Sequence, residues 1–380
     1  MRKLAGVLMV FVLLWACAWA QGETIGFGRI NKDEVNVRKA PGEEYIFRAE
    51  RGQNVFILGS ETDAKGQEWY HVIIYRRPVQ NGSRTEGWVM GRYVDVTDEA
   101  SRDIVKVALN KNGYMALHED GTVSGAEVGF FDSEELANLL SGLRDVRDIG
   151  VGLRTYVAAG KNGALWQWGI RRLLDGEQPY TALPVRLIAS NLNVGCAFVT
   201  ATGELLLGGT MGRLKDYTFL PDGLPAAAEI EQIACYNSFL LLVDREGRMH
   251  AGSPWDSPSF GLEQWTNLSC ADICIEANHM GLSWASMRLI GVRRDGTAIA
   301  WPEALQAQIS GWTGLTDAKV GGDFVLGLRT DGTVLYAGNS TIAAQVSAWE
   351  KIASVETADT YCAAVTADGR VLFAGSLSGD

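Results

Sequence analysis

Histidine and cysteine are scarce in this sequence of 380 residues, which has four of the first and six of the second. No histidine lies in an H-E-x-x-H pattern, and Cys270-x-x-x-Cys274 lacks the second pair or the nearby histidines that a zinc site needs. The five cysteines after residue 20 are odd in number and widely spaced, so we expect buried free thiols rather than a disulfide framework. The sequence predicts neither a metal site nor a cofactor.

The common motifs of catalytic and nucleotide-binding sites are also missing. There is no G-x-x-x-x-G-K-[ST] loop, no G-x-S-x-G turn and no Asp-x-Asp-x-Asp-Gly calcium loop. The short stretches Gly26-Phe27-Gly28 and Gly150-Val151-Gly152 lack the third glycine and the β-α-β setting of a dinucleotide site. We therefore expect no catalytic residues and a protein that is not an enzyme.

An excess of positive charge is absent as well. The chain has 34 Lys and Arg against 45 Asp and Glu, a net charge of -11 that would repel nucleic acid. Hydrophobic residues at 47% and charged residues at 21% exclude an intrinsically disordered chain. What is abundant is glycine, with 44 residues, which indicates many tight turns.

The sequence has one long apolar run, and it stands at the start. Arg2 and Lys3 precede an apolar stretch from Leu4 to Trp15, and Ala18-Trp19-Ala20 follows. A basic start, a short apolar core and a small-x-small exit are typical of a secretory signal peptide over residues 1–20. We expect a secreted or envelope-associated protein whose mature chain has no transmembrane segment.

Two other interpretations of this segment remain open. A transmembrane anchor would need about 20 apolar residues, more than this run provides. Lipid attachment at Cys17 is the second, because Leu14-Trp15-Ala16-Cys17 loosely resembles a bacterial lipobox. The bulky Trp15 stands where that motif takes a small residue, which makes a lipoprotein the minor alternative.

After an expected linker over residues 21–32, residues 33–97 have the pattern of a compact all-β unit. Short β-type runs alternate with Gly, Pro and Asn turns. The runs are Val35-Asn36-Val37-Arg38, Tyr45-Ile46-Phe47, Val55-Phe56-Ile57-Leu58, Trp69-Tyr70-His71-Val72-Ile73 and Gly87-Trp88-Val89. This density of strands predicts a small barrel.

These motifs resemble the bacterial SH3-like (SH3b) family in the Asn-Val-Arg strand, the Pro41-Gly42 turn, the Trp-Tyr-x-Val strand and the closing Gly-Trp-Val. The stretch Arg76–Glu86 is longer than the usual turn of that family. The resemblance implies a groove that binds a cell-wall peptide, a glycan or another short peptide. The candidate groove residues are Arg38, Tyr45, Trp69, Tyr70 and Tyr93.

Residues 101–380 contain a repeat of about forty residues. A turn glycine, most often after Asp or Asn, recurs seven times, at Gly121, Gly163, Gly203, Gly247, Gly296, Gly332 and Gly369. The residues six and four positions before each glycine and two positions after it are apolar in all seven units. This spacing places them on one face of each hairpin. Because one hairpin cannot bury its face alone, the units must stack or close, and a seven-bladed β-propeller is predicted.

The repeat resembles the regulator-of-chromosome-condensation family. The resemblance rests on the hairpin end Asp331–Gly338, the blade entry Trp349–Ala353 and the longer unit that begins Leu165-Trp166-Gln167-Trp168-Gly169. It implies a propeller over residues 101–380 that recognises an unknown protein. The fold class we predict is therefore all-β, with a small SH3-like barrel followed by a seven-bladed propeller.

Two segments depart from the repeat. Asp132-Ser133-Glu134-Glu135 followed by Leu136, Leu139, Leu140 and Leu143 predicts one amphipathic helix on the propeller rim. The fifth unit is lengthened around Asn278–Arg288, and longer loops often carry recognition. The candidate recognition residues of the propeller are Trp166, His279 and Trp284.

Three classes of function are compatible with this organisation. The first, which we favour, is a secreted binding protein whose barrel holds a wall or peptide ligand and whose propeller recognises a protein, for instance to inhibit a secreted enzyme. The second is a lyase or hydrolase built on the propeller channel, although four scattered histidines offer little for it. The third is nucleotide exchange or chromatin binding, which the leader and the acidic charge disfavour.

Overall fold

The computed structural model describes most of the chain between residues 26 and 376. The described segments are 26–75, 84–96, 103–128, 133–152, 155–169, 181, 184–190, 195–202, 204–209, 225–226, 229–236, 239–252, 261, 264–278, 281–338 and 340–376. The expected signal peptide, with Cys17, lies outside these residues.

The N-terminal sheet unit is a single antiparallel sheet of seven strands in the order β3-β2-β6-β5-β4-β1-β7. Its core consists of alternating apolar residues such as Val37, Val55, Val72 and Val89, all fully buried. Its strands are β1 (Gly26–Ile30), β2 (Val35–Arg38), β3 (Tyr45–Ala49), β4 (Asn54–Thr62), β5 (Glu68–Tyr75), β6 (Arg84–Met90) and β7 (Val94–Val96), with the 3-10 turn η2 (Gly91–Tyr93) before the last.

The start of this unit differs from the sequence-based expectation. Residues 26–30 were expected in a linker, but they form β1, which pairs with β4 on one side and β7 on the other. Gly28 is required in this strand by close packing, because a Cβ atom there would lie 2.5 Å from Val94 Cγ1. The unit therefore begins at or before residue 26.

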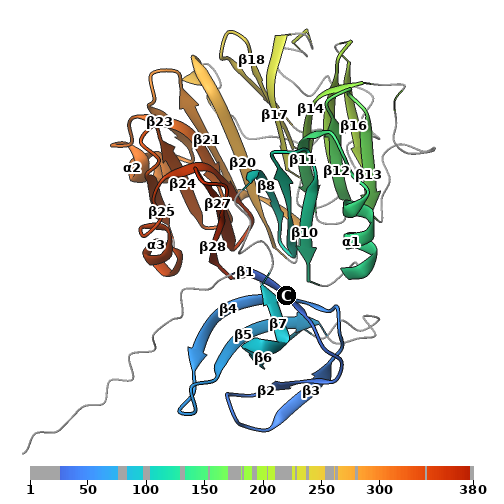
Figure 1. Ribbon diagram of the computed structural model, residues 1–380. Coiled ribbons are helices and arrows are strands. Elements are labelled where there is room, and N and C mark those ends of the chain that lie inside the picture. Colours follow the sequence, from blue (N-terminus) through green and yellow to red (C-terminus); the bar gives the residue numbers. More distant parts are fainter. Residues whose placement is uncertain are drawn as a thin grey trace, which may run out of the picture.

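The rest of the described chain forms seven three-stranded antiparallel sheets in sequence order, side by side in Figure 1. We call the first strand of each sheet its inner strand. The sheets are β8 (Ile104–Asn110), β9 (Gly113–His118) and β10 (Val123–Glu127); β11 (Val146–Gly152), β12 (Thr155–Gly160) and β13 (Leu165–Gly169); β14 (Val185–Ser190), β15 (Gly195–Thr200) and β16 (Leu205–Gly209); β17 (Ile230–Tyr236), β18 (Phe239–Asp244) and β19 (Met249–Gly252); β20 (Leu268–Asn278), β21 (Gly281–Arg293) and β22 (Ala298–Trp301); β23 (Leu315–Val320), β24 (Phe324–Arg329) and β25 (Val334–Gly338); and β26 (Ile352–Thr357), β27 (Tyr361–Thr366) and β28 (Val371–Gly375).

A single hydrogen bond recurs at the junctions between sheets. The carbonyl of a turn glycine accepts from the backbone N–H that opens the next inner strand, at 2.9 to 3.2 Å. The pairs are Gly121 with Val146, Gly163 with Val185, Gly247 with Leu268, Gly296 with Leu315, Gly332 with Ile352 and Gly369 with Ile104. The last of these joins the seventh sheet to the first. All six glycines have positive φ, as the hairpin pattern predicts, while Gly203 is outside the described residues.

The apolar repeat positions form the core between the sheets. All of them are buried except Val334 and Val371, which are half-buried. Each inner strand also has a β-bulge between its first and third residues, for example between Ile104 and Lys106 and between Leu315 and Asp317. The same β-bulge occurs at the same place in all seven sheets, so the units repeat in backbone geometry as well as in sequence. These features are those of a β-propeller.

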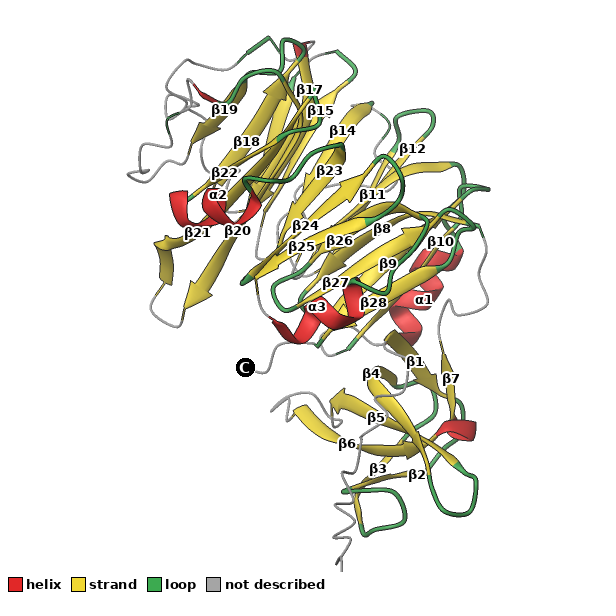
Figure 2. Ribbon diagram, turned by 90° about the vertical axis from the view of Figure 1, so that its left-hand side faces the viewer, coloured by secondary structure: helices red, strands yellow, loops and turns green. Residues whose placement is uncertain are grey.

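Among the residues that the structure describes, three short helices lie at the outer edges of the sheets (Figure 2). The predicted helix is α1 (Ser133–Ser141), and it buries Leu136 and Leu140 as expected, whereas Leu139 is 41% exposed. Helices α2 (Glu303–Ile309) and α3 (Ser340–Val346) were not predicted. Among the described residues, no helix is long and apolar enough to cross a bilayer.

The N-terminal sheet unit lies next to the first and seventh sheets (Figure 1). Aromatic side chains form the contact between them. The ring of Phe27 in β1 lies 4.8 Å from that of Tyr114 in β9 and 5.6 Å from that of Phe373 in β28. Phe56 in β4 lies 5.6 Å from Tyr361 in β27, measured between ring centroids. Because all but Phe373 are fully buried, this interface is a shared core rather than a flexible hinge.

Candidate functional site

The N-terminal sheet unit carries a cavity of about 200 Å³ at the surface around η2. Turn residues between β1 and β2, strand β2, the start of β5 and the end of β6 supply its walls. Its lining includes Lys32, Asn36, Arg38, Trp69, Arg92 and Tyr93. Loops and strand ends from four parts of the sequence therefore converge on one pocket.

Three of the five predicted groove residues line this pocket, namely Arg38, Trp69 and Tyr93. Trp69 is only 3% exposed and forms the floor, and its indole N–H donates to Asp63 Oδ2 at 3.1 Å. The guanidinium of Arg38 has a fixed position, because it donates across the turn between β2 and β3 to the carbonyl of Glu43. The pocket thus has a fixed aromatic floor and a positioned cation.

The other two predicted residues do not line the pocket. Tyr70 follows Trp69 in β5 and points to the opposite face of the sheet, where it is 8% exposed within the core of the unit. Tyr45 is exposed at the start of β3 and packs against the guanidinium of Arg48, 5.7 Å from its ring centroid. Neither Tyr70 nor Tyr45 is part of the pocket lining, so their assignment to a ligand groove stays a prediction.

Cations dominate the pocket rim. The ammonium of Lys32 and the guanidinium of Arg92 lie 5.4 and 4.8 Å from the ring centroid of Tyr93. The two lining carboxylates are drawn outward, because Asp33 pairs with Arg51 at 3.7 Å and Glu34 with Arg48 at 3.3 Å. Within the described part of the chain, Lys32, Arg38 and Arg92 form no ion pair with a carboxylate. Their charge is available to an anionic group.

One polar atom in the pocket wall lacks a partner. The side-chain amide oxygen of Asn36 is buried, and no described residue donates a hydrogen bond to it. A buried acceptor of this kind costs about 1–3 kcal/mol unless a donor reaches it. An N–H group of a ligand would supply that donor. Sequence reasoning used Asn36 only as part of a strand motif, and it missed Lys32 and Arg92 because isolated basic residues have no distinguishing pattern.

Of the predicted recognition residues of the propeller, only Trp166 has its side chain within the described residues. Trp166 in β13 is half-buried and packs against the core between the first two sheets, next to Trp168, which stacks on Tyr156. Trp284 lies on β21, but its side chain is outside the described residues, as is all of His279. The lengthening of the fifth unit is present, since β20 and β21 pair as far as Asn278 and Gly281.

The cysteines behave as the sequence suggests. Cys235, Cys274 and Cys362 are buried free thiols, and Cys270 is a half-buried one, while the side chain of Cys196 is outside the described residues. Burial raises the pKa of Cys235 to about 12, far from reactive thiolate chemistry at neutral pH. In the parts of the chain that the structure describes, no group of three or more His, Cys, Asp or Glu side chains is arranged to hold a metal ion.

No protein-family model matches this chain, and the search of curated proteins gave no match either. Among solved structures, it is similar to the CRINKLY WD40 ectodomain of the Arabidopsis thaliana receptor kinase ACR4, with 9% identity over 73% of this chain and 99% of that one, at a TM-score of 0.48. It is also similar to Prp20p from Saccharomyces cerevisiae, with 13% identity over 86% and 67% of the two chains and a TM-score of 0.28. BamB from Moraxella catarrhalis matches with 12% identity over 83% and 96% at a TM-score of 0.34. Similarities at this level carry no information about what this chain binds.

Proposed function

We propose that this chain is a secreted or envelope-associated binding protein rather than an enzyme. In this proposal the N-terminal sheet unit is an SH3-like barrel that binds the peptide part of the cell wall. The propeller, with seven blades, presents a surface for recognition of a protein partner. The observation that carries the proposal is the pocket that combines Lys32, Arg38 and Arg92 with an aromatic floor.

A peptide with free carboxylates suits this pocket. Its carboxylates would pair with the guanidinium and ammonium groups on the rim, where charge-assisted hydrogen bonds are the strong ones. Its backbone N–H groups would satisfy the amide oxygen of Asn36. Tyr93, which is half-buried, offers flat apolar surface to its side chains or to an attached sugar, above the buried Trp69. Cell-wall peptides combine several carboxylates with a row of backbone N–H groups, whereas the glycan without its peptide has one carboxylate for each disaccharide.

The seven-bladed interpretation of the propeller is supported by the bond between Gly369 and Ile104, which repeats at the closing seam the bond found at the other junctions. Radial closure of this kind leaves only short sheet edges and frees the faces of the ring for contact with other molecules. The identity of the protein partner is not part of the proposal.

Calorimetric titration of the mature chain, residues 21–380, with soluble wall fragments tests the pocket. We expect binding of a disaccharide-peptide fragment and no binding of the same glycan without its peptide. Arg92→Ala should weaken binding about tenfold or more, since one charge-assisted hydrogen bond is worth about 1.5 kcal/mol. Lys65→Ala, which removes an exposed cation away from the pocket, should leave it unchanged. Equal binding of both fragments, or none by either, would overturn the peptide assignment.

A further inference from the structure

A second cavity, of about 300 Å³, lies among the inner strands of the propeller, and all seven of them contribute to its lining. Its volume is at the lower end of the range of small-molecule sites, roughly 300–1000 Å³. The fifth residue of each inner strand lines it. These residues are Ala108, Gly150, Ala189, Ala234, Asp272, Lys319 and Glu356.

This ring of equivalent positions has two different halves. At this ring position the first four sheets contribute only glycine and alanine, which form a narrow apolar wall. Beside it the same sheets also contribute Lys106, Asp148, Glu231 and Gln232 to the lining. The last three contribute Asp272, Lys319 and Glu356, so the opposite wall is charged. Because the repeat makes these positions equivalent in the backbone, the difference lies in the side chains alone. Closure of the ring does not require this division into an uncharged and a charged half. Such a division is typical of a cavity that receives an amphipathic group.

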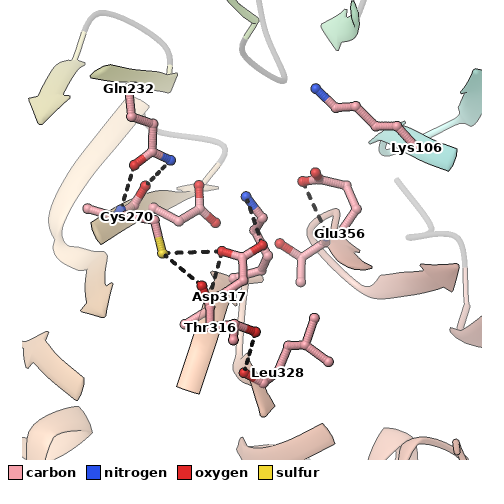
Figure 3. Close-up of polar contacts among 12 residues, drawn as sticks. Lys106, Gln232, Cys270, Thr316, Asp317, Leu328 and Glu356 are labelled. Carbon is pink, nitrogen blue, oxygen red and sulfur yellow. Dashed lines mark hydrogen bonds and ion pairs between the residues drawn. The ribbon is translucent and has the colours of Figure 1, made fainter. Parts of the chain in front are cut away.

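The charges that line the cavity do not cancel, because there are four carboxylates (Asp148, Glu231, Asp272 and Glu356) and two ammonium groups (Lys106 and Lys319). Lys106 is paired with Asp148 at 2.5 Å, and the ammonium of Lys319 lies 3.9 Å from Asp317. Asp272 accepts from the backbone N–H of Val320 at 3.0 Å, and Glu356 from that of Thr357 at 3.3 Å. No described residue forms an ion pair within 4.0 Å of either carboxylate. Figure 3 shows Lys106, Gln232, Asp317 and Glu356 coming from separate strands around this space.

Burial makes the ionised forms of Asp272 and Glu356 less favourable. It raises the pKa of Asp272 and of Glu356, although the nearby Lys319 opposes this change. An added positive charge close to both groups would favour their ionised forms. The cavity therefore has room, an apolar wall and an uncompensated negative charge in one place.

We propose that this cavity binds the cationic end of an aliphatic chain, an alkylammonium or guanidinium group. The head would lie between Asp272 and Glu356, and the stem would lie along Gly150, Ala189 and Ala234. Such a group can come from a free aliphatic amine or from a lysine or arginine side chain of a partner polypeptide. This inference goes beyond the proposed function, and it does not depend on the pocket of the N-terminal sheet unit.

Calorimetric titration of the mature chain with two probes distinguishes the sources. The first probe is cadaverine, and the second is a blocked glycine-lysine-glycine peptide. Binding of cadaverine alone assigns the site to small amines, and equal or tighter binding of the peptide assigns it to a partner side chain. Pentanoate, which has a similar stem and the opposite charge, should not bind. No binding by either cation at millimolar concentration, or equal binding of pentanoate, would overturn the proposal.

Three variants localise the site. Asp272→Asn and Glu356→Gln should each weaken binding of the cation about tenfold or more, because each removes one charge partner. Ala234→Leu fills the apolar wall and should abolish binding without a change of charge, so the test survives if a carboxylate variant fails to fold. Glu350→Gln, an exposed carboxylate outside the cavity lining, is the matched control. Unchanged affinity in both Asp272→Asn and Ala234→Leu would place the cation elsewhere.

Discussion

Aspartate recurs directly before the turn glycine of several hairpins, and a further aspartate, Asp244, stands three residues before the turn glycine Gly247 at the end of β18. Asp120, Asp295 and Asp331 each accept bonds from the backbone and hydroxyl of the threonine two residues later. Asp244 in the fourth sheet is instead 1% exposed, and it accepts from Arg248 Nε at 3.0 Å and shares a bond of 2.9 Å with His250. Burial alone would raise the pKa of Asp244, but these hydrogen bonds prevail and lower it to about 2.

We predict that Asp244→Asn lowers the free energy of unfolding at pH 7 by about 1–3 kcal/mol, because it breaks a buried, charge-assisted network. The folded-state pKa lies below the ordinary value of 3.8, so the ionised group stabilises the fold above about pH 4. This contribution disappears as the pH falls from about 4 to about 2. Urea unfolding across that pH range should show a smaller loss of the free energy of unfolding in Asp244→Asn than in the wild-type protein. Asp331→Asn, at an exposed turn, is the control, and equal loss in all three proteins would contradict the account.

At the scale of the element, the periodic features were predictable and the short ones were not. Turn glycines, apolar hairpin faces and helix α1 each rest on a pattern that repeats or extends over several turns. Helices α2 and α3 span seven residues each, too few for a periodic signal, and α2 buries only Leu305 and Ile309. In the pocket, Arg38, Trp69 and Tyr93 were found through a family motif, whereas Lys32, Asn36 and Arg92 are assembled by tertiary contacts that no local pattern contains.

The turn glycines yield a prediction with a matched control. Gly247 has a φ of +76°, and a Cβ atom there would lie 2.6 Å from the backbone nitrogen of Leu268, where the bond between sheets forms. Gly66 has nearly the same φ, +74°, but open space around it. Both Gly→Ala variants incur left-handed strain of about 1–2 kcal/mol. We expect Gly247→Ala to lower the melting temperature clearly more than Gly66→Ala, as differential scanning calorimetry can measure. Equal effects would mean that the junction bond contributes little.

At the scale of the whole molecule, the N-terminal sheet unit contacts the propeller at the seam, the junction of the seventh and first sheets where Gly369 bonds to Ile104. The hydroxyl of Tyr361 in the seventh sheet shares its proton between the carbonyls of Asn110 and Gly113, both in the first sheet, at 2.7 and 2.8 Å. Phe27 and Phe56 of the N-terminal sheet unit cover this same region, and Asn54 donates to the carbonyl of Glu127 at 2.9 Å. The unit therefore closes over the seam, and its removal would expose a buried aromatic cluster.

We expect this interface to make the mature chain unfold as one cooperative body. Phe27→Ala removes the ring at the centre of the cluster and should cost about 3–5 kcal/mol. In calorimetry it should also divide a single transition into two, and Phe373→Ala should do the same from the propeller side. Val37→Ala, in the core of the N-terminal sheet unit, should lower the transition temperature without dividing it. Two transitions already in the wild-type protein would refute the coupling.

The measurement that tests the central claim most directly is co-sedimentation of residues 21–380 with purified peptidoglycan. Point variants are preferable to a deletion, because loss of the N-terminal sheet unit would uncover the seam. We predict that wild type and Lys65→Ala pellet with the wall, whereas the Lys32→Ala/Arg92→Ala double variant, folded by circular dichroism, stays in solution. Equal pelleting of all three, or of none, would contradict the assignment of this pocket to the cell wall.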